Sequence, residues 1–293
     1  MTGFRPFTLN LRGRLVSFDR PAVMAIVNAT PDSFYEGSRT PGAEAVAARV
    51  EQVVNEGADI IDLGAYSSRP GADDVSTDEE LKRLTAAMKA LREVAPDIPV
   101  SIDTFRADVA RRCIEELGAD IINDISGGTL DPAMFETVAG LRVPYILMHM
   151  RGTPSTMSTL TDYPRGVVTE VIDNLSRIID RLRLMGVSDI IADPGLGFAK
   201  TVSQNYELLA AVPAMTELLE TPVLIGLSRK SMLFKPLGIT PGEALEATVA
   251  ADTLALAGGA SIIRVHDVKA GVETREIVSL TLRAGTENKQ TNK

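Results

Sequence analysis

The chain has 293 residues and a formal net charge of −9, because 39 acidic residues outnumber 30 basic ones. Hydrophobic residues make up 45% of it, enough for a large core, while the 4% aromatic content disfavours a stacking platform for single-stranded nucleic acid. The negative charge also disfavours nonspecific duplex binding, so we expect no nucleic-acid partner.

The cysteine and histidine content excludes several kinds of site. The single cysteine, Cys113, cannot form an intramolecular disulfide, and His149 and His266 cannot by themselves supply a three-histidine zinc site. We expect Cys113 to be a buried structural thiol in a reducing cytoplasm. No signal peptide is visible near the N-terminus, and no apolar run reaches the roughly 18 residues of a membrane span.

Short, mostly continuous apolar runs recur along the chain, which is typical of strands buried on both faces of a parallel sheet. In chain order the eight predicted strands are Ala22–Val27, Asp59–Leu63, Ile98–Ile102, Asp120–Ile125, Val143–Met148, Asp189–Ala192, Pro222–Gly226 and Ala260–Val265. Segments with helical periodicity between them are Gly42–Gly57, Thr77–Val94, Arg106–Leu117, Gly166–Met185 and Glu243–Gly258. The predicted C-terminal helix caps are Gly57, Gly118, Gly186 and Gly258 or Gly259.

Repeated strand–helix units without a Pro/Gly/Ser-rich linker predict a single α/β domain. We predict a (β/α)8 TIM barrel over residues 1–284 and a disordered polar tail over residues 285–293. A doubly wound open sheet is the alternative. The strand number and the polar residues at the strand ends favour the barrel.

Polar side chains stand at or just after the C-terminal end of nearly every predicted strand. In a barrel these ends form one mouth, where barrel enzymes place their chemistry. Taken singly, such a residue could be only a turn former or a cap, as Asp193 or Ser228 could be. The set comprises Asn28, Asp62, Ser67–Arg69, Asp103, Asn123, Asp124, His149, Asp193, Ser228, Arg229, Lys230, Arg264 and His266.

The acidic part of this set suits a flat heterocycle. Asp103, Asn123 and Asp193 supply carboxylate and amide groups that can pair with the donor edge of a 2-amino-pyrimidinone ring. A divalent-cation site built from the same oxygens is the alternative.

The basic part of the set indicates an anionic substrate, because a positive field in an acidic protein must be built locally. Surface salt bridging is the alternative, above all for Arg229. The basic residues are Arg69, Arg229, Lys230, Arg264 and His266.

Two neighbouring residues have more than one interpretation. His149 could form part of the pocket wall or could be a satisfied core histidine, and Met148 is expected to offer an apolar face to a planar ring. No GxxxxGK[ST] phosphate loop is present, and no dinucleotide fingerprint follows the first strand.

Taken together, these motifs resemble the dihydropteroate synthase family. The matching stretches run in family order from about residue 22 to 283. They are Met24–Phe34, Gly57–Gly64, Ser67–Gly71, Ser101–Thr104, Ile122–Gly128, Met148–Met150, Asp193–Phe198, Ser228–Ser231 and Arg264–Val268.

The resemblance implies a transferase that moves an alkyl group other than methyl. It would condense 6-hydroxymethyl-7,8-dihydropterin pyrophosphate with p-aminobenzoate, giving 7,8-dihydropteroate and pyrophosphate, with Mg²⁺ as cofactor. The resemblance also implies a cytoplasmic homodimer with small-molecule substrates and no membrane partner.

Residue by residue, the resemblance implies three overlapping binding sets. The pterin would contact Asp103, Asn123, Ile125, Met148, Asp193, Phe198, Lys230 and Arg264. The aminobenzoate would be bordered by Phe34, Ser68, Arg69, Pro70, Ser228 and Lys230. The pyrophosphate would be held by Asn28, Arg69, Arg264 and His266, with Asn28 also a Mg²⁺ ligand. The residues expected to carry catalysis are Asp32, Arg69, Asp103, Lys230, Arg264 and His266.

The sequence departs from the family pattern at Ala29, Glu36–Ser38, Ala65–Tyr66, Ser68 and Ala199. Two other activities are weighed against the resemblance. A methyltetrahydrofolate–corrinoid methyltransferase would share the barrel and the pterin clamp, but it has no need of the basic residues after the last two strands. A catalytically silent pterin-binding relative is the second alternative.

Overall fold

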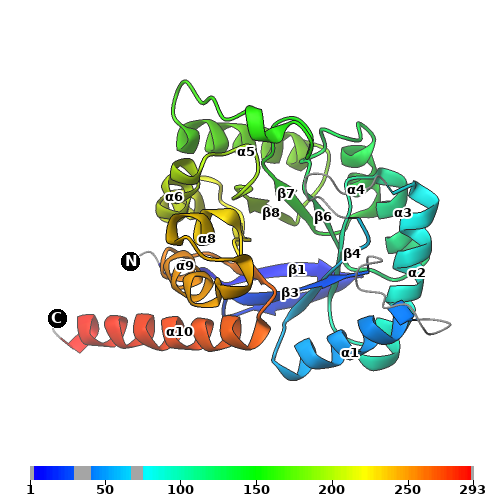
Figure 1. Ribbon diagram of the computed structural model, residues 1–293, viewed down its shortest axis with the longest axis horizontal. Helices are drawn as coiled ribbons and strands as arrows, with labels where there is room; N and C mark the ends of the chain where they lie inside the picture. Colours follow the sequence, from blue (N-terminus) through cyan, green and yellow to red (C-terminus); the bar gives the residue numbers. More distant parts are fainter. Residues whose placement is uncertain (1–2, 30–40, 67–74, 292–293) are drawn as a thin grey trace.

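Eight parallel strands form the centre of the molecule, as the apolar runs predicted, and helices surround them (Figure 1). The structure, a computed structural model, describes residues 3–29, 41–66 and 75–291. The strands are β3 (Ala22–Asn28), β4 (Ile60–Gly64), β5 (Val100–Asp103), β6 (Ile121–Asp124), β7 (Tyr145–Met148), β8 (Ile190–Asp193), β9 (Leu224–Ile225) and β10 (Ile262–Val265).

The sheet is wound into a barrel. Its strand order is β8-β7-β6-β5-β4-β3-β10-β9, and every neighbouring pair is parallel. A parallel bridge between Ala192 and Val223 joins β8 to the residue just before β9, and the Ala192 amide donates to the Pro222 carbonyl at 2.9 Å. These contacts connect the two ends of the strand order, so the predicted TIM barrel is confirmed over the open sheet.

The helices that the sequence predicted are present with small shifts at their ends. These are α1 (Pro41–Asn55), α2 (Thr77–Val94), α3 (Ala107–Glu115), α5 (Val167–Leu184) and α9 (Leu245–Ala257). Gly57, Gly118 and Gly186, expected at the helix ends, have positive φ angles; α9 ends at the cap residue Gly258, with φ −75°, and Gly259 after it has φ +99°.

Several elements had not been predicted; most of them are short or contain proline, whereas α10 is long and mostly polar in its last turns. The helices in this group are α4 (Met134–Leu141), α6 (Val202–Ala210), α7 (Val212–Leu218), α8 (Ser231–Leu237) and α10 (Val268–Thr291). The remaining elements are an antiparallel pair, β1 (Phe7–Leu11) and β2 (Arg14–Phe18), and 3-10 turns at Met157–Thr159 and Pro241–Glu243.

The last helix differs from the expectation for the C-terminus. α10 continues through residues 285–291, which the sequence analysis had assigned to a disordered tail, and extends away from the barrel (Figure 1). A helix satisfies its backbone hydrogen bonds internally, so it can continue through polar residues without an apolar face. Among the described residues, no helix is both long and apolar enough to cross a bilayer.

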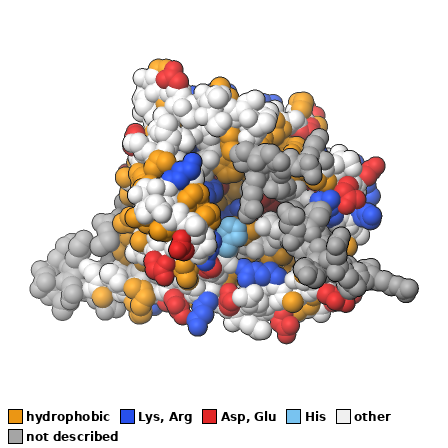
Figure 2. Space-filling model, in the orientation of Figure 1, with side chains coloured by type: hydrophobic (Ala, Val, Ile, Leu, Met, Phe, Trp, Pro, Cys, Tyr) orange, Lys and Arg blue, Asp and Glu red, His pale blue; other side chains and the backbone are white. Residues whose placement is uncertain are grey.

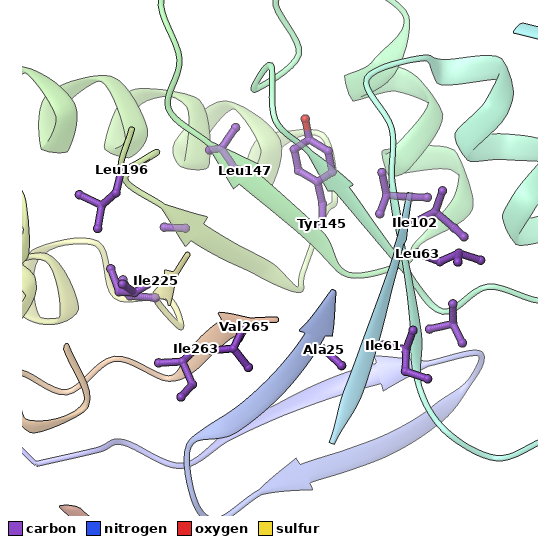
Figure 3. Packing of buried hydrophobic residues seen from close by; sticks show 14 of the residues in the cluster. Ala25, Ile61, Leu63, Ile102, Tyr145, Leu147, Leu196, Ile225, Ile263 and Val265 are labelled. Carbon is purple, nitrogen blue, oxygen red and sulfur yellow. The ribbon is translucent and has the colours of Figure 1, made fainter. Parts of the chain in front are cut away.

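Alternate residues of each strand face the helices and form the main core. Figure 3 shows part of this cluster, including Ile61 and Leu63 of β4 and Ile263 and Val265 of β10. The intervening residues point into the barrel, where those nearest the strand starts form a second apolar cluster. Leu9 and Leu11 of β1 belong to this second cluster, so the N-terminal pair closes the end of the barrel opposite the mouth.

Candidate active site

The period of two along a strand decides which side chains enter the barrel mouth. On β6, Asn123 follows the inward-facing apolar Ile121 by two residues and therefore faces inward as well. On β10, Arg264 follows Ile262 in the same way. The same step leads from Ile191 to Asp193 on β8. The barrel interior therefore changes from apolar to polar within one layer of residues, at the C-terminal ends of the strands.

Arg264 lies at the centre of a buried network. Its Nε is 2.6 Å from Oδ2 of Asp62, and its second guanidinium nitrogen is 2.8 Å from Oδ2 of Asp103. The Asn123 side-chain amide donates to the same Asp62 oxygen at 3.0 Å. The acidic and basic halves of the mouth, which are separate in the sequence, therefore meet at Arg264.

Burial raises the pKa of Asp103 to about 7. Arg264 opposes this shift, whereas the neighbouring carboxylates Asp62, Glu80 and Asp124 reinforce it. Asp103 therefore exchanges its proton near neutral pH unless a ligand supplies hydrogen-bond donors to the carboxylate.

Asp193 and Lys230 form the opposite side of the mouth. The backbone N–H of Gly195 donates to Asp193 Oδ1 at 2.7 Å, and Lys230 Nζ donates to the Leu196 carbonyl at 2.6 Å. Burial raises the pKa of Asp193, while the positive charge of Lys230 opposes that shift. Burial lowers the pKa of Lys230 to about 8, against the attraction of Asp193.

Apolar side chains lie beside these polar groups. Ile125 and Met148 belong to a small cluster with Met150, Met157 and Ala199, and Phe198 packs against it. Lys230 Nζ is 4.8 Å from the centroid of the Phe198 ring. The predicted apolar wall residues are therefore brought together beside Asp193 and Lys230.

His149 is a satisfied buried histidine, which resolves the two interpretations left open by the sequence. It is 4% exposed, and its Nδ1 is 3.1 Å from Lys200 Nζ. Lys200 Nζ also donates to the carbonyls of Gly195 and Phe198, at 2.9 and 2.8 Å. Burial lowers the pKa of His149 to about 3, so the ring is neutral at pH 7. Lys200, which the sequence analysis did not select, thus ties β7 to the loop after β8.

His266 and Asn28 lie on the β3 and β10 side of the mouth. They line a cavity of about 310 Å³ together with Arg49 of α1, and the Asn28 side chain is exposed. His266 Nδ1 is 3.1 Å from Ser228 Oγ, which also accepts the His266 backbone N–H at 3.2 Å. Burial, with Arg264 nearby, lowers the pKa of His266 to about 4. Figure 2 shows on this face a surface histidine with Lys or Arg side chains beside it.

Arg229 does not face the cavity as a free cation. Its Nε and second guanidinium nitrogen bind Asp267 at 2.8 and 3.0 Å, and it also donates to the Pro241 carbonyl at 2.8 Å. This is the salt-bridge alternative that the sequence left open.

Arg49 was not predicted from the sequence, because it is one polar position on an amphipathic helix and no local pattern indicates its place beside the mouth.

The remaining sequence predictions concern Cys113, the possible metal ligands and the site residues after β3 and β4. Cys113 is buried, and burial raises the pKa of its thiol to about 12, as expected of an unreactive structural cysteine. The described residues contain no group of three or more His, Cys, Asp or Glu side chains suited to a metal ion. The predicted residues Asp32, Phe34, Ser68, Arg69 and Pro70 lie outside the described residues.

Comparisons with known proteins agree with this geometry. A family model described as pterin binding enzyme matches residues 24–266. A dihydropteroate synthase of Synechocystis sp. is 46% identical over 254 residues, which is 86% of this chain and 86% of the relative. The structure of Xanthomonas albilineans dihydropteroate synthase with 4-aminobenzoic acid superposes with a TM-score of 0.85 at 38% identity, covering 94% of this chain and 98% of that one.

A second structure of the Xanthomonas albilineans enzyme, in complex with 7,8-dihydropteroate, has a TM-score of 0.83 and 36% identity. It covers 94% of this chain and 99% of the other. The match of the family model over most of the chain, and of full-length relatives at these identities, shows that the chain belongs to the pterin-binding enzyme family and, within it, to the dihydropteroate synthases.

Proposed function

We propose that this chain condenses 6-hydroxymethyl-7,8-dihydropterin pyrophosphate with p-aminobenzoate, releasing pyrophosphate and forming 7,8-dihydropteroate. In this reaction it is a transferase of an alkyl group other than methyl. The observation that carries the proposal is the convergence of Asp103, Asn123 and Asp193 with Lys230 and Arg264 in one barrel mouth, beside an apolar wall.

The pterin ring fits this mouth by its edge and by its faces. Carboxylate and amide oxygens can accept the N–H groups of the 2-amino-pyrimidinone edge, and the Asp193 carboxylate has the geometry to accept two in parallel. Ile125, Met148 and Phe198 offer apolar surface to the ring. We assign Arg264 to stack near it, as the resemblance implies. Lys230 Nζ donates one N–H to the Leu196 carbonyl and lies beside the Phe198 ring. Because an ammonium group has three donors, another N–H can bind a ring acceptor of the pterin.

Loss of pyrophosphate from the exocyclic methylene is the demanding step. The electron-rich dihydropterin can stabilise the resulting carbocation, so the protein has to stabilise the departing anion and keep water away. Arg264 and His266 are the described groups that we assign to the anion, and His266 can donate through Nε2 when Nδ1 accepts from Ser228. Arg69 and Asp32 are assigned to the same step.

Asn28 suits a role as a magnesium ligand. Asn28 is exposed and lines the cavity with His266, and its side-chain amide offers an oxygen ligand; Mg²⁺ commonly combines one or two protein oxygens with substrate phosphates and water. When bound, Mg²⁺ would neutralise charge on the pyrophosphate. The donor set therefore fits this cofactor.

The aminobenzoate then attacks with its amino nitrogen. An aniline nitrogen is already neutral at pH 7, so no strong general base is required and positioning carries much of the rate. We assign Ser228 and Lys230 to the border of this substrate, together with Phe34, Ser68, Arg69 and Pro70.

We further propose that the protein is a cytoplasmic homodimer that uses α9 and α10 as its interface. Leu254 of α9 and Ile277 and Leu280 of α10 are 62%, 64% and 56% exposed. An Ile277→Glu variant should sediment as a monomer if these side chains meet a second copy, whereas an unchanged mass would place the interface elsewhere.

The activity is tested by incubating the purified protein with the pterin pyrophosphate, p-aminobenzoate and Mg²⁺. Stoichiometric dihydropteroate and pyrophosphate support the proposal. Substrate binding without product would instead indicate the silent relative. Methyl transfer from methyltetrahydrofolate to a corrinoid, without condensation, would indicate the methyltransferase.

A further inference from the structure

The cavity beside Asn28 and His266 contains a cation that the family motifs do not include. Arg49 lies on α1, and Ala45 and Val46 of the same helix line the cavity with it. Residues 45 and 49 are one helical turn apart and share a face, while Val46 and Val50 are buried against the barrel. The position of Arg49 is therefore set by packing of the helix and not by a flexible loop.

The hydrogen-bond partners of Arg49 are neutral. One guanidinium nitrogen donates to the backbone carbonyl of His266, and the other donates to Gln52 Oε1 at 2.9 Å. Gln52 in turn donates to Glu56 at 2.7 Å, which fixes the orientation of its amide. Along the described parts of the chain, no carboxylate lies within ion-pair distance of Arg49.

This distinguishes Arg49 from the other arginines at the mouth. Arg264 is paired with Asp62 and Asp103, and Arg229 is paired with Asp267. Asp267 is held by its hydrogen bonds to Arg229, which lower its pKa, and Arg49 adds a smaller contribution to that shift without forming an ion pair. In a protein of net charge −9, a partly buried guanidinium that has no ion pair of its own leaves a local positive charge in the cavity. Such a charge is suited to an anion that arrives with the substrate.

We infer that Arg49 is a further binding residue for the diphosphate group of the pterin substrate and for the pyrophosphate product. The inference rests on the proposed function. A guanidinium has five N–H donors in a planar fork that matches phosphate oxygens, and the two contacts to His266 and Gln52 leave donors for a ligand. Asn28, His266 and Arg49 then surround the diphosphate from three elements, β3, the end of β10 and α1.

The test is Arg49→Gln, with three ligands measured on each variant. We expect the KM for the pterin pyrophosphate and the inhibition constant of inorganic pyrophosphate to rise about 10- to 100-fold, as for loss of a hydrogen-bonded charged partner. Affinity for 6-hydroxymethyl-7,8-dihydropterin, which has no phosphate, should stay within about twofold of the unsubstituted protein. Arg49→Lys should give an intermediate value, because it keeps the charge but loses the fork.

Arg112→Gln on α3 is the matched control, since it removes the same charge from an exposed ion pair with Glu116. Unchanged pyrophosphate inhibition in Arg49→Gln would overturn the inference. So would an equal loss of affinity for the phosphate-free pterin, because Arg49 would then act only by holding His266. Failure of the proposed function is distinguishable, since the unsubstituted protein itself would then form no dihydropteroate.

Discussion

At the scale of single residues, the chemistry of the mouth depends on charges that are buried in pairs. Asp62 is fully buried and receives both Arg264 and Asn123, so it holds these two side chains at a fixed separation. A buried carboxylate is tolerated only when such partners compensate its desolvation. The same interactions that make the site stable therefore also preorganise it for a ligand.

Asp193 offers the clearest residue-scale prediction. Asp193→Asn replaces one of two acceptor oxygens by a donor, so a pterin edge would meet a mismatched group. We expect the Kd for the phosphate-free pterin to rise by about 10- to 100-fold, measured by quenching of pterin fluorescence.

Asp189→Asn is the matched control for that measurement, because Asp189 stands at the opposite end of β8. Its carboxylate accepts the backbone N–H of Asn10 at 2.7 Å, far from the mouth. Its substitution should lower stability and leave pterin affinity unchanged. Equal affinity in both variants would contradict the assignment of Asp193.

The raised pKa of Asp103 predicts a pH dependence of binding. Because this pKa is about 7, Asp103 gains a proton as the pH falls through neutrality and loses acceptor capacity. We expect pterin affinity to decrease between about pH 8 and about pH 6, one unit on either side of the pKa. Asp103→Asn should remove this part of the dependence, and a flat profile in the unsubstituted protein would contradict the prediction.

Stability should change with pH in the opposite direction, over a range that begins at lower pH. The ordinary pKa of the carboxyl is 3.8, so between that value and about 7 the folded state binds more protons than the unfolded chain. The contribution of Asp103 to the free energy of unfolding therefore falls as the pH rises from about 4 to about 7. Urea unfolding of the unsubstituted protein and Asp103→Asn across this range measures the difference.

At the scale of elements, the loops after β6, β7 and β8 approach each other closely. Lys200 joins the loops after β7 and β8, because its ammonium group donates to the carbonyl of His149 in the first and to those of Gly195 and Phe198 in the second. Ala199, one of the positions that depart from the family pattern, has φ +51°, and its carbonyl accepts the Tyr163 hydroxyl at 3.0 Å. An alanine in this left-handed region costs about 1–2 kcal/mol, so the surrounding contacts must hold the loop in place.

Gly195→Ala should disrupt this arrangement. Gly195 has φ +68°, and a Cβ there would lie 2.0 Å from the His149 carbonyl oxygen, which is backbone and cannot move aside cheaply. We expect displacement of the loop that carries Phe198, a large loss of pterin affinity and a lower melting temperature.

Gly166→Ala provides the comparison for Gly195→Ala. Gly166 also has a positive φ, +85°, but no atom lies within 4 Å of its added Cβ. It should therefore show only the cost of the backbone conformation, about 1 kcal/mol, with unchanged binding. Similar effects of the two substitutions on pterin affinity would exclude the close contact with His149 as the cause.

At the scale of the whole molecule, the N-terminal strand pair closes the barrel at the end opposite the mouth. Leu9 is 1% exposed within the interior apolar cluster, and Arg12 binds Asp120 at 2.6 Å. Burial of this cluster contributes to global stability without touching the site. Stability and binding can therefore be separated by substitutions at opposite ends of the barrel.

Leu9→Ala tests this separation. Loss of a buried leucine typically costs about 2–5 kcal/mol, so we expect a clear fall in the denaturant midpoint with kcat preserved at low temperature. Leu15→Ala on β2 is the control, because Leu15 is 78% exposed and its truncation should be nearly neutral. Loss of kcat in Leu9→Ala at a temperature where it is fully folded would show that the two ends are coupled.

The sequence by itself determined the barrel and most of the polar residues at its mouth. Strand burial is a local property, so an apolar run such as Asp120–Ile125 predicts a strand. It does not predict which of its residues face inward, since the run is apolar on both faces: Asn123 binds Asp62 in the mouth, whereas its neighbour Asp124 binds Ser126 and Tyr145. The glycines at the helix ends, such as Gly57 and Gly186 with their positive φ angles, follow from local rules as well. The short helices and the β1–β2 pair were not predicted, because their sequence patterns are brief or depend on distant contacts. The long helix α10 was not predicted either.

Only the tertiary structure decided which charges meet. Arg264 pairs with Asp62, 202 positions away, Arg229 is bound by Asp267, and Lys200 contacts His149 across two loops. Arg49 reaches the mouth because α1 packs against β3, the sheet neighbour of β10, a relation that the residues around Arg49 in the sequence do not indicate. Pairing through space depends on the closure of the barrel, and a local sequence pattern does not encode it.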